Sequence, residues 1–140
     1  MCISIIVLTF LATSKSKYSG VITALALSPC GNLFAAARDR YLCVGPTSLE
    51  ELSKGAECKL QENRLLHTAK ITTLDFSPDS KLLLSGGIDC QVFVWDVEDP
   101  EKFEKYVSVN APLGVTQAKW IDQTRFLTVG PDAIIKLWSK

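Results

Sequence analysis

Three related units follow one another along the chain, at intervals of about 45 residues. The Ser-Pro pairs that begin at Ser28 and Ser77 lie 49 residues apart, and Trp95 and Trp138 lie 43 residues apart. A repeat of this length is one supersecondary unit that cannot bury its apolar face alone, so neighbouring units must stack. The sequence therefore predicts a repeat architecture, with units at about 19–60, 67–109 and 111–140 in the 140 residues.

Each unit shows the same internal order of apolar segments and turns. A first strand leads through a polar turn into a second strand, and a tight turn containing an Asp leads into a third. No segment shows a long 3.6-residue period, and the nearest candidate, 49–60, contains a glycine. We therefore expect an all-β fold, with weaker fourth strands near 57–60 and 105–109. The main predicted strands are 21–27, 33–37, 41–44, 70–76, 82–85, 92–95, 115–121, 126–129 and 134–138.

The first 18 residues need a separate interpretation. Residues 3–10 are apolar and rich in β-branched side chains, which predicts a buried strand from a preceding unit. The apolar stretch also has the length of a signal-peptide core, although no Lys or Arg precedes it. It is too short to span a bilayer as a helix. The strand and the targeting or anchoring segment both remain open at this stage.

The charge balance argues against two classes of partner. Lys and Arg number 15 and Asp and Glu number 15, so the formal net charge is zero. This balance excludes the broad basic footprint of a nucleic-acid-binding protein and argues against binding to anionic membranes.

The cysteines suggest neither a disulfide framework nor a zinc site. Their number is odd, and no two of them are spaced as Cys-x-x-Cys. We interpret them as single thiols packed in the core in a reducing compartment. They are Cys2, Cys30, Cys43, Cys58 and Cys90.

The second unit resembles a WD repeat, the four-stranded blade of a β-propeller. In that family a His before the first strand, a Ser or Thr in the second, an Asp in the turn and a Trp in the third form a hydrogen-bonded set. The second unit matches all four, and Asp96 completes the Trp-Asp pair. A buried indole, hydroxyl and imidazole each need a partner, and the Asp supplies acceptors. The implied structural tetrad is His67, Ser85, Asp89 and Trp95.

The other two units match the WD pattern only in part. The third keeps Asp132 and Trp138, with Ala111 and Val129 where His and Ser would stand. The first keeps only Asp39, and the remaining places hold Tyr18, Ala36 and Gly45. The resemblance implies about three four-stranded antiparallel blades of an incomplete propeller.

No catalytic, metal or cofactor site follows from the sequence. Ser85, His67 and Asp89 have the residue types of a hydrolytic triad, but the tetrad already accounts for them, and no nucleophile-elbow motif is present. Gly86-Gly87 lacks the context of a phosphate-binding loop and indicates a turn or strand end. The acidic residues between 96 and 101 are not spaced as a calcium loop. We therefore expect no enzyme activity and no cofactor.

A narrower resemblance is to the C-terminal blades of the actin-interacting protein 1 family. It extends from 19 to 140, weakening toward the N-terminus, and rests on the Asp-Pro-Glu at 99–101 and on Trp120. It also includes the ending formed by Asp132, Ala133, Lys136 and Trp138. The family has two WD-repeat propellers and promotes actin filament disassembly with cofilin. The resemblance implies a non-enzymatic interaction module in the cytoplasm, associated with the cytoskeleton, whose partners are actin filaments and cofilin.

Alternative functions remain open in the sequence. The chain is interpreted as a fragment of a ring of about seven blades, so open blade edges are expected to favour self-association. Charged loops at 50–64 and 98–105 are candidate interaction surfaces, although the residues that contact a partner stay unknown. The alternatives are a scaffold of another multiprotein assembly and a membrane-anchored or secreted protein that uses the N-terminal segment.

Overall fold

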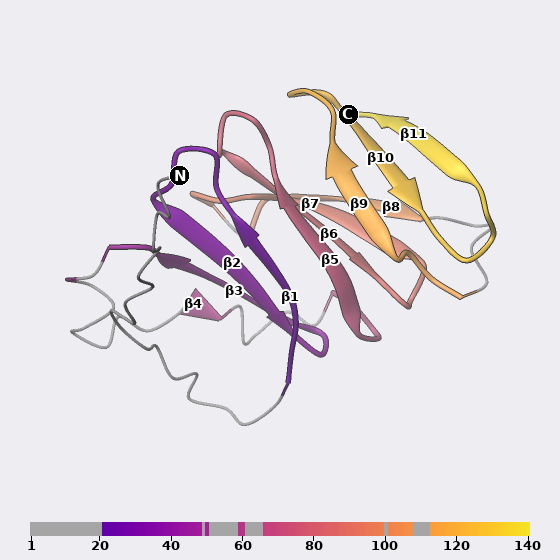
Figure 1. Cartoon of the computed structure of the whole chain (residues 1–140), viewed down its shortest axis with the longest axis horizontal. Helices are drawn as coiled ribbons and strands as arrows, with labels where there is room; N and C mark the ends of the chain where they lie inside the picture. The colour runs from indigo at the N-terminus through magenta and orange to yellow at the C-terminus, as the bar shows by residue number, and fades with distance from the viewer. Residues whose placement is uncertain (1–20, 49, 51–58, 61–65, 100, 108–112) are drawn as a thin grey trace, which may run out of the picture.

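Three antiparallel β-sheets lie side by side in the computed structural model of the protein (Figure 1). The structure describes residues 21–48, 50, 59–60, 66–99, 101–107 and 113–140. The predictions for residues 1–18 lie outside this part of the chain. All eleven elements of the described part are strands, which confirms the all-β prediction.

Each sheet corresponds to one predicted unit, and we call the sheets blades 1, 2 and 3. In blades 1 and 2 four strands pair in chain order, and in blade 3 the order is β11-β10-β9. Blade 1 contains β1 (Ile22–Leu27), β2 (Leu33–Arg38), β3 (Tyr41–Pro46) and β4 (Lys59–Leu60). Blade 2 contains β5 (Ile71–Phe76), β6 (Leu82–Gly87), β7 (Gln91–Asp96) and β8 (Phe103–Val107). Blade 3 contains β9 (Gln117–Trp120), β10 (Arg125–Val129) and β11 (Ile135–Ser139).

The repeated Ser-Pro pairs mark equivalent turns between the first and second strands of blades 1 and 2. The hydroxyl of Ser28 accepts a hydrogen bond from the backbone N–H of Leu33 at 3.0 Å. The hydroxyl of Ser77 accepts one from the N–H of Leu82 at 2.9 Å. In both turns the serine N–H also donates to the carbonyl of that same leucine, at 2.9 Å. The serine therefore closes the turn from both sides, which gives the repeated pair a local structural cause.

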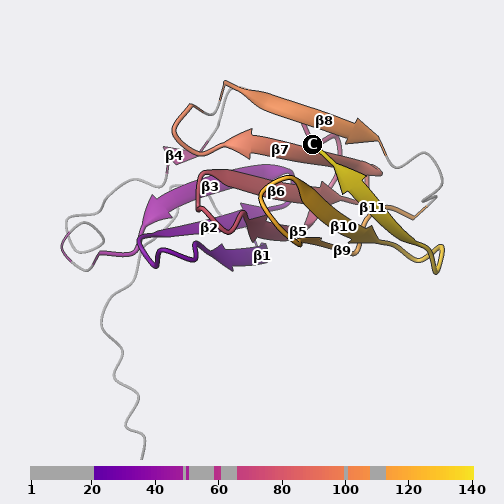
Figure 2. The same ribbon diagram turned by 90° about the horizontal axis from the view of Figure 1, so that it is seen from above.

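The blades stack through their first strands, β1, β5 and β9 (Figures 1 and 2). Thr23 donates its hydroxyl to the carbonyl of Ile71 at 2.7 Å, and Thr72 does the same to the carbonyl of Val115. The N–H of Ile71 donates to the carbonyl of Asp39 at 2.7 Å, and the N–H of Val115 donates to that of Gly87 at 2.9 Å. The same junction therefore joins blade 1 to blade 2 and blade 2 to blade 3.

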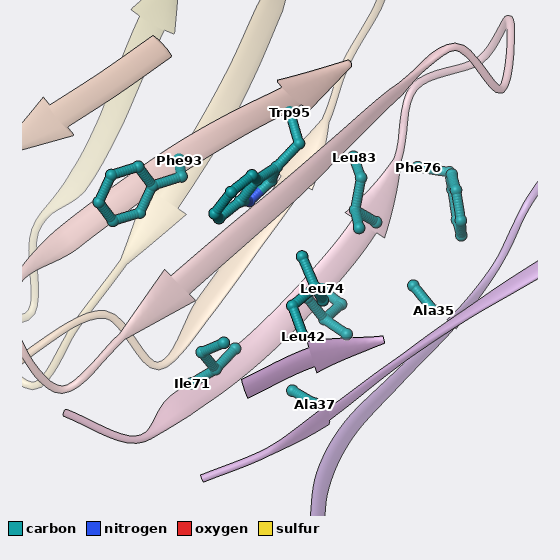
Figure 3. Packing of buried hydrophobic residues seen from close by; sticks show 9 residues of the cluster. All are labelled: Ala35, Ala37, Leu42, Ile71, Leu74, Phe76, Leu83, Phe93 and Trp95. Carbon is teal, nitrogen blue, oxygen red and sulfur yellow. The ribbon is translucent and has the colours of Figure 1, made fainter. Parts of the chain in front are cut away.

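The hydrophobic core lies between the blades rather than inside any one of them. One cluster fills the space between blades 1 and 2 (Figure 3). A second cluster fills the space between blades 2 and 3. The strands β6 and β7 are buried on both faces because blade 2 has a neighbour on each side. The first cluster consists of Ala35, Ala37, Leu42, Ile71, Leu74, Phe76, Leu83, Phe93 and Trp95. The second consists of Leu84, Val92, Val94, Val115, Ala118 and Phe126.

The structure corrects the interpretation of the cysteines at two positions. Cys43, in β3, is disulfide-bonded. Cys30 and Cys90 form no disulfide, and Cys30 is exposed, so the prediction that it packs in the core is wrong. The prediction of five single thiols is therefore wrong at Cys43, because spacing along the chain carries no information about which distant cysteines the fold brings together.

Candidate functional site

Blade 2 brings together the four side chains that the sequence singled out. The Trp95 indole N–H donates to the hydroxyl oxygen of Ser85 at 2.8 Å. That hydroxyl lies 2.9 Å from Nε2 of His67, and Nδ1 of His67 lies 3.0 and 3.1 Å from the two carboxylate oxygens of Asp89. Because a carboxylate only accepts, Nδ1 is the donor, and Nε2 then accepts the Ser85 proton. The four residues form one continuous chain of donors and acceptors.

The strands of blade 2 hold each member in place. Ser85 lies in β6 and Trp95 in β7, while His67 precedes β5 and Asp89 lies in the β6–β7 turn. The ring of Phe93 packs edge-on against His67, with their centroids 4.7 Å apart. His67 and Ser85 are fully buried, so the hydrogen bonds replace the water that these groups would otherwise bind.

Asp89 also organises the backbone around it. Its carboxylate accepts from the N–H of Thr68 at 2.8 Å and from that of Gln91 at 3.1 Å. Burial by itself would raise the pKa of Asp89, but the hydrogen bond from His67 and these two N–H donors lower it below its usual value. Asp89 therefore ties the start of β5 to the start of β7.

Gly87 is required beside this set because a side chain there would collide with it. A Cβ atom would lie 2.8 Å from Oδ1 of Asp89 and 2.9 Å from Nδ1 of His67. At Gly86 a Cβ would lie 2.9 Å from the side chains of both Thr73 and Val115. The two glycines end β6, where the sequence placed a turn or strand end, and Gly86 permits the close approach of Val115 from blade 3.

The arrangement serves packing better than chemistry. Ser85 is fully buried and already accepts the Trp95 N–H, so its hydroxyl cannot reach a substrate in this structure. Within the described ranges, no group of three or more His, Cys, Asp or Glu side chains is arranged to hold a metal ion. The hydrogen-bonded set locks β5, β6 and β7 together at the interface with blade 1.

Blade 3 builds part of the same set with a different partner for its Asp. Trp138 donates its indole N–H to the hydroxyl of Thr128 at 2.8 Å. Thr128 therefore stands at the place equivalent to Ser85. The prediction that Val129 stands there is wrong by one residue. Asp132 pairs with the ammonium of Lys136 at 2.9 Å, and this hydrogen bond holds the pKa of Asp132 below its usual value. Ala111 lies outside the described residues.

Blade 1 keeps the shape of the repeat without its polar set. Ala36, which pairs with Cys43, stands at the place of Ser85 in blade 2. Gly45, which pairs with Phe34, stands at the place of Trp95. Asp39 is exposed in the β2–β3 turn, where its carbonyl accepts from Ile71. Its backbone has a positive φ of 54°. Tyr18 lies outside the described residues.

Residues 103–105 of the predicted loop at 98–105 belong to β8, so the β7–β8 loop is shorter than predicted. Oδ1 of Asp96 accepts from the N–H of Glu98 at 2.9 Å and from that of Asp99 at 3.0 Å. Lys102 pairs with Asp99 at 3.1 Å. These contacts show Asp96 capping a turn and Asp99 in an ion pair. Of the other predicted loop, 50–64, most residues lie outside the described part.

The fold and the repeated polar set agree with a family comparison. The family model described as "WD domain, G-beta repeat" matches residues 8–44 and 61–96. The chain belongs to the WD40 repeat family. Blade 2 of this WD40 protein has the complete polar set of the repeat, and blade 3 has a reduced version of it.

Curated relatives of this WD40 protein include one that is named for its interaction with actin. The chain is 29% identical over 125 residues to the "66 kDa stress protein" of Physarum polycephalum, which covers 89% of this chain and 20% of the relative. It is 37% identical over 73 residues to "WD repeat-containing protein 1" of Mus musculus, covering 52% of this chain and 12% of the relative. It is 29% identical over 72 residues to "Actin-interacting protein 1" of Drosophila melanogaster, covering 51% of this chain and 12% of the relative. The chain thus spans a fifth or less of the length of these relatives.

Solved structures agree on the architecture. The WD40 repeats of RRP9 superpose with a TM-score of 0.73 at 16% identity, covering 87% of this chain and 36% of that one. The β-propeller domain of Cps50 (Swd1) from Myceliophteria thermophila superposes with a TM-score of 0.71 at 20% identity, covering 89% of this chain and 36% of that one. At these identities the likeness shows the propeller fold alone. Among the described residues, no helix is long and apolar enough to cross a membrane.

Proposed function

We propose that this protein binds actin filaments and promotes their disassembly together with cofilin, without chemistry of its own. The observation that supports the proposal most directly is the sequence similarity to actin-interacting protein 1 and WD repeat-containing protein 1 over about half of the chain. The binding role follows from the WD40 repeats, which are generally interaction modules. Such modules present loops on a rigid β framework.

The β7–β8 loop is the described surface best suited to this role. Asp96 holds the backbone of the loop, so the exposed side chains of Glu98 and Lys102 project from a fixed turn. The N–H of Val97 donates to the carbonyl of Lys81 at 2.9 Å, which joins this loop to the β5–β6 turn beside it. A preorganised charged loop loses little conformational entropy when it meets a partner.

A filament pelleting assay with and without cofilin tests the proposal. The chain should sediment with filaments, and it should increase the actin left in the supernatant when cofilin is present. Replacing Glu98 by Lys should reduce both effects, since it reverses a charge on the loop. The matched control is Thr68→Lys, which introduces the same side chain at an exposed position beyond the opposite end of the strands of blade 2.

Two outcomes would count against the proposal. A chain that neither sediments with filaments nor enhances disassembly by cofilin would overturn the actin function. It would favour instead a scaffold role in another assembly. Equal losses in Glu98→Lys and Thr68→Lys would remove the β7–β8 loop as the contact surface.

A further inference from the structure

The junction between blades has a hydroxyl donor at the same position of each repeat. The hydroxyls of Thr23, Thr72 and Thr116 each donate to a carbonyl of the second strand in their own blade, at 3.3, 3.1 and 3.1 Å. Thr23 and Thr72 share that one proton with a carbonyl of the next blade, at Ile71 and Val115. Thr116 is exposed, and within the described ranges no following blade meets it. Blade 3 therefore presents an unused copy of the junction.

Blade 1, at the opposite end of the stack, exposes the other side of this junction. The residues of blade 2 that face the preceding blade are Ile71, Leu74 and Phe76, and they are 1%, 3% and 4% exposed. At the equivalent positions of blade 1 stand Ile22, Leu25 and Leu27, which are 53%, 64% and 66% exposed. We call these three residues of β1 the leading face.

Blade 3 exposes the surface that the other blades bury against their successor. Val92 and Val94 of β7 are 0% and 2% exposed, because blade 3 covers them. The strand pairing places Ile135 and Leu137 of β11 at the same positions, and they are 70% and 60% exposed. We call Thr116, Ile135 and Leu137 the trailing face.

We infer that the trailing face of one copy of this chain docks on the leading face of a second copy. The contact would repeat the junction that already occurs twice within the chain: Thr116 would donate to the carbonyl of Ile22 of the second copy. Leu25 and Leu27 would cover Ile135 and Leu137, as β5 and its neighbours cover β2 and β3. The same packing has formed twice from the same positions of the repeat, so the second copy meets a surface of the right shape and polarity.

The two faces are different surfaces, so the assembly is head-to-tail. Such a contact either closes a ring or grows as an open chain. An isologous dimer, in which one face pairs with itself, would not place the Thr116 hydroxyl against the backbone carbonyl that Thr23 and Thr72 meet in the two internal junctions. Burial of five large aliphatic side chains drives the association, and it should persist at high salt because no ion pair is required. The inference is independent of the actin function.

Sedimentation or light scattering of the whole chain tests the inference. The wild-type protein should have at least twice the monomer mass of 15.4 kDa. The variants Leu25→Glu, on the leading face, and Leu137→Glu, on the trailing face, should each weaken association by about a hundredfold, since each buries a charge in an apolar contact. Val107→Glu is the matched control, because Val107 is an exposed aliphatic residue of β8 in the middle blade.

Mixing the two variants separates head-to-tail docking from other association. Leu25→Glu keeps an intact trailing face and Leu137→Glu keeps an intact leading face, so an equimolar mixture should form a complex of one copy of each. Circular dichroism would verify that every variant retains its β structure. A monomeric wild-type protein, equal association by all variants, or a mixture that stays monomeric would each overturn the inference.

Discussion

Trp138 donates its indole N–H to the hydroxyl of Thr128 at 2.8 Å, as Trp95 does to Ser85 at the same distance. Both bonds join the second strand of a blade to the third, and each lies at the interface with the preceding blade. Blade 3 thus keeps the bond between the Trp and the hydroxyl, although its Asp is paired with a lysine instead of a histidine.

Thr128→Val should lower the free energy of unfolding by about 1 kcal/mol, because the side chain keeps its shape and the Trp138 indole loses an acceptor. Urea unfolding followed by tryptophan fluorescence would measure the loss. Thr128→Ser is the control, since it retains the hydroxyl. A valine variant as stable as the serine variant would show that the bond contributes nothing.

The position of this hydroxyl shows where sequence reasoning reached its limit. Blades 2 and 3 differ in the length of the turn between their second and third strands, which runs from Ile88 to Cys90 in one and from Gly130 to Ile134 in the other. Aligning the last residues of the predicted second strands, 82–85 and 126–129, selects Val129. Strand pairing selects Thr128, because a shift of one residue moves a side chain to the other face of a sheet.

The strands themselves were predictable because their signals are local. Alternating apolar residues and the Ser-Pro turns mark each strand within a few positions along the chain, and the nine main strands appear where they were expected. The link from Asp75 to blade 3 was not predictable. It depends on which side chains of two stacked blades face each other, and residues 44 or 45 positions apart meet there.

Ser85→Ala should destabilise the protein more than any change at Thr128. Ser85 serves two buried groups, so its loss leaves both Nε2 of His67 and the Trp95 indole without a partner. The expected cost is about 2–4 kcal/mol in the free energy of unfolding, measured by urea titration. Ser139→Ala, at an exposed position, should stay within about 0.5 kcal/mol of the wild type. A similar effect in both variants would contradict the role given to Ser85.

Acid should weaken the protein through Asp89. Its pKa in the folded state lies below the value of about 3.9 in an unfolded chain, so the unfolded state binds more protons in this range. The stability that Asp89 contributes is therefore present at neutral pH and is lost as the pH falls from about 5 through the folded pKa.

The variant Asp89→Asn should be less stable than the wild type at pH 7, and its stability should fall less steeply between pH 5 and 3. Urea titrations over this range would give both slopes. Thr68→Ala serves as the control, because it keeps the backbone N–H that donates to Asp89 and adds no titrating group. Identical slopes in all three proteins would exclude Asp89 as a source of the acid sensitivity.

Asp75→Ala should loosen blade 3 without unfolding the other blades. The Asp75 carboxylate accepts from the N–H of Trp120 at 2.8 Å and from the ammonium of Lys119 at 2.7 Å, so it ties β5 to β9. A hydrogen bond to a charged group contributes about 1.5 kcal/mol or more, which corresponds to roughly tenfold faster hydrogen exchange in β9 and β10. Amides of β6 and β7 should change little. Asp99→Ala removes an ion pair inside one exposed turn and should leave exchange in blade 3 unchanged. Uniformly faster exchange in all three blades would instead show that the blades open as one unit and that Asp75 stabilises the whole stack.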